Sequence, residues 1–346
     1  MGSCTGGLLG NTDERLRRYY HPVARSQDIT CEPFKVKLLG QDWVVFRSDE
    51  KIRAYVDRCP HRNAPLSIGV WDDSAIQCAY HGWRFALDGN CNFIPAISPG
   101  GIIPKSAKLT QAAEIVERYG LVFLAPEPPL LALLDIPQDS DVKFCRAHLM
   151  PVDATQHAGY LADNFLDMGH FAFVHSATFG NELNAFVVPY ELNVFDDGLD
   201  AVYEHTFLNR EDPGVLRGER DLLQRRKMTY RYRVPFSMSL ALSFVDVGNN
   251  TVIGFFILPV EEGLSRLFTV LWRDDMAADD PKMNEAIDFE LKVLDEDLKI
   301  QQSYAMPGFA LDPKLEVHTT ADRITVAMRR VLLKNLTGSS FYLDDT

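Results

Sequence analysis

Residues 59–85 read CPHRNAPLSIGVWDDSAIQCAYHGWRF, and this stretch decides how the N-terminal third of the chain folds. It contains two short pairs of metal-binding side chains, Cys59 with His61 and Cys78 with His81, with sixteen residues between the pairs. Thiolates are soft ligands and imidazoles are intermediate ones, so a mixed set suits zinc or an iron–sulfur centre. The stretch therefore predicts a metal-binding fold built around two ligand-bearing loops.

The order of the ligands separates these two kinds of centre. Zinc fingers pair their ligands as C-x2–4-C and H-x3–5-H, whereas each pair here holds one Cys and one His. The C-x-H-x16-C-x2-H spacing resembles the Rieske signature, in which two Cys bind one iron of a [2Fe-2S] cluster and two His bind the other. Two neutral His raise the reduction potential from roughly −400 mV to about −150 to +300 mV. Such a centre accepts electrons from a low-potential donor.

The composition bounds the class of protein and its partners. The chain has 346 residues, 46% of them hydrophobic and 24% charged, which fits a globular protein of two domains or one large one. The net charge of −13 argues against nucleic acid or an anionic membrane as partner. No apolar run approaches the roughly 20 residues of a membrane span. Residues 1–11 lack the features of a signal peptide, and the remaining cysteines show no disulfide pattern, so we expect a cytoplasmic protein.

The N-terminal part predicts a small all-β domain. We expect a flexible tail over residues 1–14, with a short helix at 12–20, and a domain over residues 15–125. Strand-like runs lie at 34–39, 43–47, 53–56, 75–78, 114–118 and 121–124. Turn signals such as Asp88-Gly89-Asn90 separate them, so both ligand pairs fall in loops.

The remaining sequence predicts a second, α+β domain over residues 146–346. A proline-rich linker is expected at 126–145, because three of the four residues 126–129 are proline. A long helix at 156–174 precedes strands at 186–195, 200–207, 227–233, 237–245, 251–258 and 266–272, and helices at 281–304 and 321–333 follow. An antiparallel sheet with flanking helices is the predicted architecture.

A second set of ligand-type side chains lies in the first long helix, where residues 163–175 read DNFLDMGHFAFVH. Two His and one carboxylate with open coordination positions suit a non-haem Fe(II) that binds O2. His170 and His175 are five residues apart, about 140° around an ideal helix. Both can bind one ion only if the helix widens or ends between them, which Gly169 makes plausible. The alternatives are core histidines and solvent-facing Asp163 and Asp167.

Taken together, these motifs resemble the catalytic α subunit of a Rieske non-haem iron oxygenase over residues 15–335. The first motif also has the family's Pro60, Arg62, Gly82 and Trp83. The second, N-x2-D-x2-H-x4-H, is matched by Asn164, Asp167, His170 and His175. The resemblance implies an N-terminal all-β Rieske domain followed by a helix-grip-like catalytic domain.

The resemblance also implies roles for individual residues. Cys59, His61, Cys78 and His81 would hold the [2Fe-2S] cluster, and His170 and His175 would bind a mononuclear Fe(2+). Asp167 and Asn164 are the candidate catalytic residues, Asp167 bridging to His81 of the neighbouring subunit in a head-to-tail homotrimer. The third iron ligand would be Asp297, which lies in an E-D-x-x-I pattern. Asp295 is the rival, with Asp288 and Glu290 behind it.

The implied function is activation of O2 to hydroxylate or demethylate a small aromatic or heterocyclic substrate. Residues 316–330 resemble the monooxygenase branch that includes vanillate O-demethylase and dicamba demethylase. Residues 236–244 and 255–258 would shape the substrate site. No flavin or nicotinamide motif is present, so a separate ferredoxin or NAD(P)H-dependent reductase would supply electrons. The alternatives are a cis-dihydroxylating ring dioxygenase, a Rieske electron carrier, for which about 110 residues suffice, and a zinc-stabilised binding module.

Overall fold

The computed structural model describes residues 7–72, 74–182, 185–210, 212–304 and 306–338. The chain divides into two compact units. The N-terminal unit consists of residues 12–132 with 259–262, and the C-terminal unit consists of residues 1–11, 133–258 and 263–346. Within the described residues, no helix is both long enough and apolar enough to cross a membrane.

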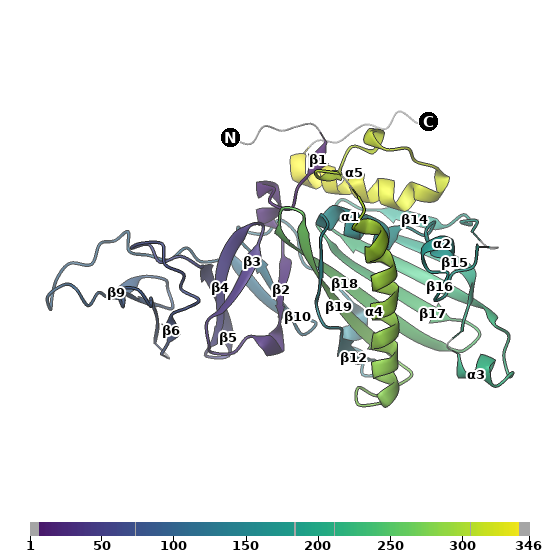
Figure 1. The fold of residues 1–346 in the computed structure, drawn as a ribbon, viewed down its shortest axis with the longest axis horizontal. Helices are drawn as coiled ribbons and strands as arrows, with labels where there is room; N and C mark the ends of the chain where they lie inside the picture. Colours follow the sequence, from purple (N-terminus) through teal and green to yellow (C-terminus); the bar gives the residue numbers. More distant parts are fainter. Residues whose placement is uncertain (1–6, 73, 183–184, 211, 305, 339–346) are drawn as a thin grey trace. The chain divides into compact units, whose positions relative to one another are not determined.

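The N-terminal unit is built from three small antiparallel sheets (Figure 1). Their strand orders are β10-β11-β2, β3-β4-β5 and β6-β7-β8-β9. The strands are β2 (His21–Arg25), β3 (Phe34–Leu38), β4 (Gln41–Ser48), β5 (Lys51–Val56), β6 (Val70–Trp71), β7 (Ala75–Gln77), β8 (Arg84–Ala86), β9 (Cys91–Phe93), β10 (Glu114–Arg118) and β11 (Leu121–Ala125). Short 3-10 turns lie at Glu14–Arg18 and Ser26–Asp28. The all-β prediction is confirmed, although β2, β6, β8 and β9 were not anticipated.

The core of this unit explains why β4 was predicted as a strand. Trp43, Val44, Val45 and Phe46 are consecutive and fully buried, so β4 packs on both faces as the middle strand of its sheet. A continuous apolar run of this kind is the pattern of a strand buried on both sides. The missed strands are only two to five residues long, and β2 contains Pro22.

The C-terminal unit is an eight-stranded antiparallel sheet with helices on it. The order is β12-β19-β18-β17-β16-β15-β14, with β13 also paired to β19. The strands are β12 (Cys145–His148), β13 (Val152–Ala154), β14 (Glu191–Val194), β15 (Gly198–Leu208), β16 (Leu223–Arg233), β17 (Ser237–Phe244), β18 (Asn249–Glu261) and β19 (Leu264–Arg273). The helices are α1 (Ala158–Leu166), α2 (Phe171–Val174), α3 (Pro213–Leu216), α4 (Pro281–Gln301) and α5 (Arg323–Thr337), with 3-10 turns at Pro137–Asp139, Pro313–Leu315 and Thr320–Asp322.

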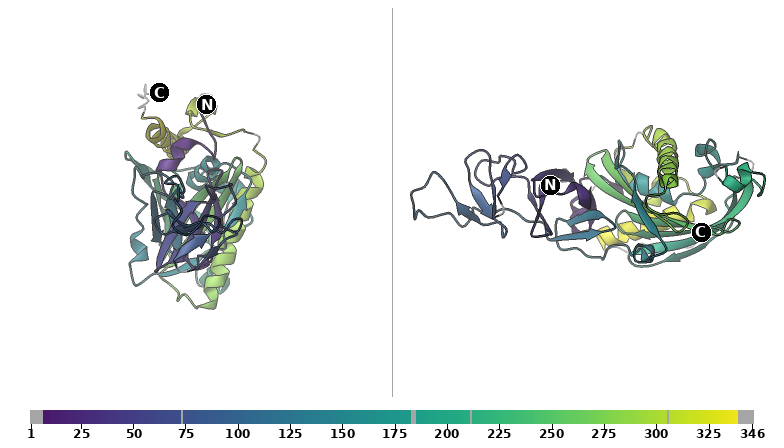
Figure 2. Two further views of the ribbon diagram at one scale, coloured as in Figure 1. Left: turned by 90° about the vertical axis from the view of Figure 1, so that its left-hand side faces the viewer. Right: turned by 90° about the horizontal axis from the view of Figure 1, so that it is seen from below.

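One face of this sheet is covered by α4. Figure 1 shows α4 crossing in front of the strands, and the right-hand view of Figure 2 looks nearly along it, with the sheet curving beside it. The alternate residues Arg226, Met228 and Tyr230 of β16 are buried, while Arg225 and Lys227 are exposed. This period of two is that of a strand with one covered face.

The ends of α4 follow ordinary capping rules. Asp280 accepts a hydrogen bond from the backbone of Lys282, and Pro281 occupies the first helical position, where its missing N–H costs nothing. The helix ends at Gln301, three residues before the predicted end. Met283 and Leu298 are buried along it, so α4 packs through one face.

Two predicted segments differ from the structure. The single helix expected at 156–174 is two helices, α1 and α2, because the chain becomes extended at Asp167. In the predicted flexible tail, Leu8 and Leu9 form β1 and pair with Ala310 and Phe309 of β20 (Phe309–Ala310). Leu9 is 2% exposed, so burial of an apolar side chain accounts for this strand. Residues 1–6 of the tail lie outside the described residues.

Asp57 fixes the loop that follows β5. Its Oδ1 accepts hydrogen bonds from the backbone N–H groups of Leu66 and Ser67 at 2.6 and 2.7 Å, and its Oδ2 accepts one from the Ser67 hydroxyl at 2.6 Å. Asp57 is only 7% exposed, so these three bonds replace the water that its carboxylate loses. The loop between them carries Cys59 and His61.

We predict that Asp57→Ala lowers the free energy of unfolding by about 3 kcal/mol, because it leaves the buried N–H of Leu66 and the partly buried N–H of Ser67 without an acceptor. Ser67→Ala removes one of the three bonds and should cost only about 1 kcal/mol. Urea unfolding of the full chain measures both, with hydrogen exchange of residues 64–68 as the local readout. Equal effects of the two substitutions would contradict this role of Asp57.

Candidate metal centres

Two loops of the N-terminal unit have the same backbone hydrogen bonds. The N–H of Cys59 donates to the carbonyl of Ala64, and the N–H of Asn63 donates to the carbonyl of Cys59. The loop of Cys78 repeats this pattern, with Cys78 donating to Trp83 and Gly82 donating to Cys78. Asn63 and Gly82 occupy the same place and have φ of 61° and 66°.

The positive φ explains the residue types at that place. Left-handed backbone is tolerated best by Gly and, among the other residues, by Asn and Asp. A side chain at position 82 would also approach Pro95, since a Cβ built there lies 3.1 Å from its Cγ. The matched turns therefore need Asn63 and Gly82, and they present Cys59 and Cys78 in the same way.

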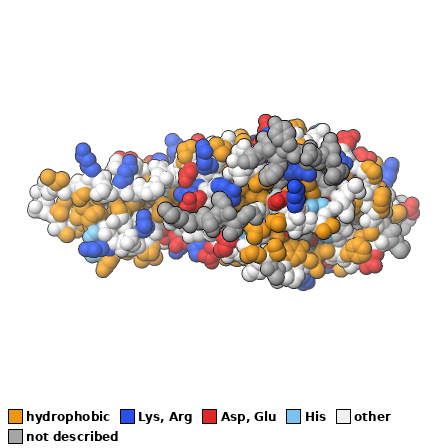
Figure 3. Space-filling view, turned by 90° about the horizontal axis from the view of Figure 1, so that it is seen from above, with side chains coloured by type: hydrophobic (Ala, Val, Ile, Leu, Met, Phe, Trp, Pro, Cys, Tyr) orange, Lys and Arg blue, Asp and Glu red, His pale blue; other side chains and the backbone are white. Residues whose placement is uncertain are grey.

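The four predicted cluster ligands divide into a buried pair and a surface pair. Cys59 and Cys78 are each 1% exposed and belong to the hydrophobic core of the unit. The rings of His61 and His81 lie 4.4 Å apart, and His61 stacks on Trp83 at 4.4 Å. Figure 3 shows a histidine at the surface of this unit among hydrophobic and basic side chains. This arrangement puts the imidazole side of the site nearest the solvent.

The donor set fits a Rieske-type cluster. The two thiols belong to one core cluster, and the two imidazoles lie against each other. Two Cys and two His are the ligands of such a cluster. Nδ1 of His61 is buried and has no hydrogen-bond partner in the described part of the chain. A buried ring nitrogen without a partner is costly unless a ligand satisfies it.

The second centre depends on the end of α1. Asp167 is extended, with ψ of 139°, so the helix stops after Leu166. The Asp167 carboxylate then accepts hydrogen bonds from the N–H groups of Gly169 and His170 at 2.8 and 3.2 Å. Asp side chains favour such local bonds over continued helix. The chain turns here, before His170. The short helix α2 that follows ends at Val174, so a helix end lies between the two histidines, as the sequence required.

His170, His175 and Asp297 converge on one point. The Nε2 atoms of His170 and His175 lie 3.1 Å apart. Oδ1 of Asp297 lies 3.4 Å from Nε2 of His170 and 3.3 Å from Nε2 of His175. The donor atoms of the three residues all lie within 4.8 Å of one another, close enough to hold one metal ion. Oδ1 of Asp297 is buried and has no hydrogen-bond partner within the described residues.

These distances fit an octahedral ion. Metal bonds of about 2.1 Å put neighbouring ligand atoms about 3.0 Å apart, close to the three separations found here. Two imidazoles and one carboxylate on one face leave the opposite positions free for O2 or water, the arrangement of non-haem Fe(II) oxygenases. The residues present therefore fit a mononuclear Fe(II).

Of the four acidic residues considered as the third iron ligand, Asp297 is the one that meets the two histidines. Asp297 points to the two histidines, whereas Asp295 forms an ion pair with Lys299 at 2.6 Å and its side chain is 63% exposed. Asp288 is also exposed. Glu290 lines the neighbouring cavity.

Glu296 was missed as a site residue, although the sequence showed an acid before Asp297. Its Oε2 accepts hydrogen bonds from Nδ1 of His175 at 2.9 Å and from the hydroxyl of Thr178 at 2.8 Å. A carboxylate on the second nitrogen of a ligating histidine fixes the ring and its tautomer. Nε2 of His175 therefore carries the lone pair toward the ion.

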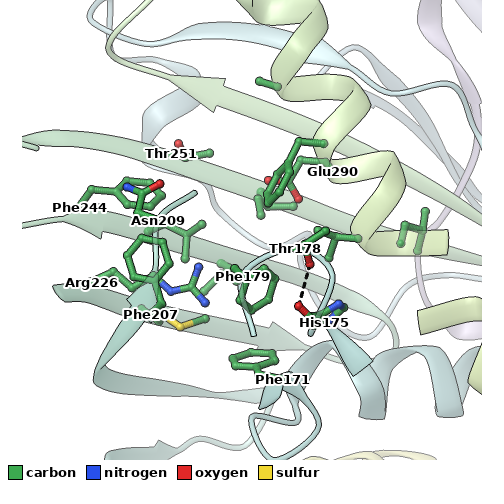
Figure 4. A pocket seen from close by; sticks show the side chains of 18 of the residues that line it. Phe171, His175, Thr178, Phe179, Phe207, Asn209, Arg226, Phe244, Thr251 and Glu290 are labelled. Atoms are coloured by element: carbon green, nitrogen blue, oxygen red, sulfur yellow. Dashed lines mark hydrogen bonds between the residues drawn. The ribbon is translucent and has the colours of Figure 1, made fainter. Parts of the chain in front are cut away.

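The turn after α2 is also tightly built. The Thr178 hydroxyl, which donates to Glu296, also shares its hydrogen with the carbonyl of His175 at 3.2 Å, the dashed bond in Figure 4. The N–H of Gly180 donates to the same carbonyl at 2.7 Å, and a Cβ at Gly180 would lie 2.3 Å from the carbonyl oxygen of Phe171. A side chain cannot fit there without moving His175.

Asp167 also contacts the first iron-ligand candidate. Its Oδ2 lies 3.1 Å from Nδ1 of His170. Burial raises the pKa of Asp167, but the hydrogen bonds from His170 and the backbone outweigh burial and lower it. Asp167 is thus a carboxylate at neutral pH. Its side chain remains 27% exposed, so one edge is open to a partner.

A cavity of about 660 Å³ opens beside this centre. Asn164, the second candidate catalytic residue, lines it with the three converging side chains. Leu240, Leu242, Phe244 and Phe255 lie in the strands predicted to shape a substrate site, and they line it too. The polar lining residues Arg226, Tyr230 and Thr251 were missed. They could have been found from the alternation along β16 and β18, which places them on the face of the sheet that lines the cavity.

The chain matches two known families. A model of the Rieske [2Fe-2S] domain matches residues 19–116. A model of the vanillate O-demethylase oxygenase C-terminal domain matches residues 138–337, more than half of the chain.

The curated relatives match along nearly the whole chain. Methylxanthine N1-demethylase NdmA of Pseudomonas putida is 28% identical over 336 residues, covering 94% of this chain and 90% of the relative. Methylxanthine N3-demethylase NdmB of the same organism is 28% identical over 333 residues, covering 91% of this chain and 88% of the relative.

Solved structures share the fold. Pseudomonas putida CBB5 NdmA with caffeine has a TM-score of 0.78 at 24% identity, over 97% of this chain and 99% of that one. Dicamba monooxygenase bound to dicamba has a TM-score of 0.77 at 21% identity, over 93% of this chain and 97% of that one.

We predict that Asp297→Ala lowers the affinity of the mononuclear site for Fe(II) by roughly a hundredfold or more, because it removes one of three converging ligand atoms. Asp295→Ala, two residues earlier on an exposed part of the same helix, is the matched control and should bind Fe(II) normally. Metal analysis after dialysis against a weak chelator measures both. Loss of iron from the Asp295 variant alone would show that the ligand is misassigned.

Proposed function

Because the chain belongs to the Rieske non-haem iron oxygenases, as a catalytic α subunit of the demethylase type, we propose that it removes a methyl group from a small aromatic or heterocyclic substrate. The convergence of His170, His175 and Asp297 beside a mainly apolar cavity carries the proposal. Its cofactors are a [2Fe-2S] cluster and a mononuclear Fe(II), which together store electrons and activate O2.

The ligands proposed for the cluster are Cys59, His61, Cys78 and His81. The buried thiols and surface imidazoles described above support this assignment. The proposed iron ligands are His170, His175 and Asp297, with Glu296 holding the ring of His175.

Asp167 is proposed to connect the two centres. Its carboxylate contacts His170 on one side and keeps an open edge on the other. In a head-to-tail homotrimer that edge would accept a hydrogen bond from His81 of a neighbouring subunit. The trimer and this bridge are predictions of the family resemblance.

The shape of the cavity supports a compact, largely apolar substrate. It is lined by aromatic and aliphatic side chains from β16, β17 and β18, with α4 on the opposite side (Figure 4). Apolar walls bind the body of an aromatic ring, and a few polar groups orient it. Asn164 lies at the cavity beside the histidines, where it can orient the substrate.

The reaction balances with an external electron donor. A methyl C–H bond becomes C–OH, and the hydroxymethyl group on nitrogen or oxygen then leaves as formaldehyde. The second oxygen atom of O2 becomes water with two electrons and two protons. A separate ferredoxin or NAD(P)H-dependent reductase is the proposed source of electrons. Hydroxylation of a C–H bond without loss of the methyl group is the same chemistry stopped one step earlier.

The proposal is tested with the iron-loaded protein, a ferredoxin–reductase pair and NADH. The substrates are methoxy- and N-methyl-substituted arenes and heterocycles. We expect O2-dependent release of formaldehyde in step with O2 uptake, since the demethylated carbon must leave in that form. Formation of cis-diols instead would favour the ring dioxygenase, and neither product with any substrate would contradict the proposed demethylation.

We predict that Asp167→Asn retains both metal centres but nearly abolishes turnover, by roughly a hundredfold or more, because the bridging carboxylate loses its charge. Formaldehyde release measures turnover, and iron and sulfide analysis checks the loading. Sedimentation of both proteins as trimers is the control. Normal turnover of the variant, or of a monomeric wild-type protein, would contradict the bridge between subunits.

A further inference from the structure

Arg329 is a cation buried where α5 packs against α1 (Figure 1). It lies on α5 and is 1% exposed. Its Nη1 and Nη2 donate to the two carboxylate oxygens of Asp163 on α1, the second at 3.1 Å. Nη2 also donates to Glu316 at 2.8 Å, and Nε donates to the carbonyl of Ala310 at 3.0 Å. Groups from three parts of the chain therefore fix the guanidinium in place.

The ion pair between Arg329 and Asp163 is better suited to fixing geometry than to adding stability. Taking two charges out of water costs about as much free energy as their attraction returns, so a buried pair adds little to stability. Two parallel N–H···O bonds, however, hold a carboxylate in one plane and at one place. What the pair determines is therefore the position of Asp163.

Asp163 lies in the last turn of α1, directly before Asn164 and four residues before Asp167. Its side chain is 22% exposed and bound to Arg329, so the alternative of a solvent-facing Asp163 is wrong. The carbonyl of Asp163 accepts a hydrogen bond from the N–H of Asp167 at 3.0 Å. Arg329 thus holds the side chain of the residue whose backbone holds Asp167.

Without Arg329, the carboxylate of Asp163 would be unfavourable at this place. The C-terminal end of a helix carries partial negative charge, and α1 has no basic residue in its last turn. Burial raises the pKa of Asp163 to about 7, and the charges of Asp167 and Glu316 add to this shift, whereas Arg329 opposes it. Arg329 is therefore the group that keeps Asp163 charged and in place.

The rest of α1 is fixed by other contacts. At its N-terminal end, the N–H of Ala158 donates to Oδ1 of the buried Asn11 at 2.9 Å. In the next turn, a Cβ at Gly159 would lie 2.3 Å from the ring of Phe309, so helix and ring are in close contact. The guanidinium of Arg329 lies 4.7 Å from the centre of the same ring. The part of α1 that depends on Arg329 is therefore its last turn.

From this juxtaposition we propose that Arg329 is a positioning residue for Asp167, because its paired bonds to Asp163 fix the last turn of α1 and hence the direction of the Asp167 carboxylate. The inference rests on the proposed role of Asp167 as the bridge between the two centres, and it adds the residues that set the geometry of that bridge. A reacting group misplaced by about 1 Å can cost roughly a hundredfold in rate.

The first test measures the passage of one electron from the cluster to Fe(III) in the trimeric holoenzyme, without O2 or substrate. One electron equivalent of dithionite reduces the cluster, which then returns to its oxidised form as Fe(III) becomes Fe(II). Loss of the Fe(III) EPR signal after rapid freezing gives the rate. We expect Asp163→Asn and Arg329→Gln to slow this transfer roughly tenfold or more while both centres stay loaded. Arg329→Lys, which keeps the charge but loses the paired bonds, should be slowed less than Arg329→Gln.

The second test, amide hydrogen exchange, does not depend on electron transfer. The N–H of Asp167 bonds to Asp163, and the N–H groups of Gly169 and His170 bond to the Asp167 carboxylate. We expect these three amides to exchange roughly tenfold faster or more in Asp163→Asn and Arg329→Gln, because the turn that they hold opens more often. Exchange in the rest of the unit should stay as in the wild-type protein.

Glu316→Gln is the matched control, because it changes the other carboxylate on the same guanidinium and leaves the paired bonds to α1. It should keep wild-type electron transfer and exchange. Wild-type transfer in a fully loaded Asp163→Asn variant would overturn the inference, and so would faster exchange throughout the unit with no local increase at residues 167–170. Asp163→Asn replaces a carboxylate by an amide of the same shape, so it decides the matter if Arg329→Gln fails to fold.

This outcome is separable from that of the proposed function. Slow transfer in Asp167→Asn beside wild-type transfer in Asp163→Asn and Arg329→Gln would overturn the role of Arg329 alone. Wild-type transfer in Asp167→Asn would overturn the bridge, while locally faster exchange in Arg329→Gln would still support the fixing of the turn by Arg329.

Discussion

The structure of the catalytic unit depends on where one helix ends. If one helix ran unbroken through both histidines, His170 and His175 would point about 140° apart, and no single ion could bind both. The helix α2 that starts after His170 ends at Val174, before His175. The Asp167 carboxylate accepts the N–H groups of Gly169 and His170 in place of helical carbonyls, and the chain turns. The two Nε2 atoms then come within 3.1 Å of each other. The long helix α4 supplies Asp297 from more than a hundred residues away in the sequence.

The same carboxylate links local structure to function. Asp167 ends the helix, contacts His170 and keeps an open edge, so one residue serves both the shape of the iron site and the proposed path of the electrons. Glu296 and Thr178 hold His175 from the other side. The iron site is therefore rigid where it binds metal, while the neighbouring cavity has room for a substrate.

Sequence reasoning worked where spacing controls geometry. The two Cys–His pairs predicted loops in an all-β unit, and the five-residue interval between His170 and His175 required a helix end or a wider turn between them; α2 ends at Val174. The earlier end of α1 was not predicted, because the apolar periodicity of residues 158–171 continues across Asp167. Sequence reasoning also missed Glu296 and Arg329. Their roles come from contacts of α4 with the turn after α2 and of α5 with α1, which no local pattern contains.

The central claim is that one chain holds a cluster and, separately, a mononuclear Fe(II) at His170, His175 and Asp297. The most direct measurement is iron and acid-labile sulfide analysis of the wild-type protein beside a variant with both histidines replaced by alanine. The account predicts one iron per chain beyond the two of the cluster, and loss of that iron alone in the variant, with the cluster spectrum unchanged. A wild-type protein with cluster iron only, or a variant that keeps the additional iron, would contradict it.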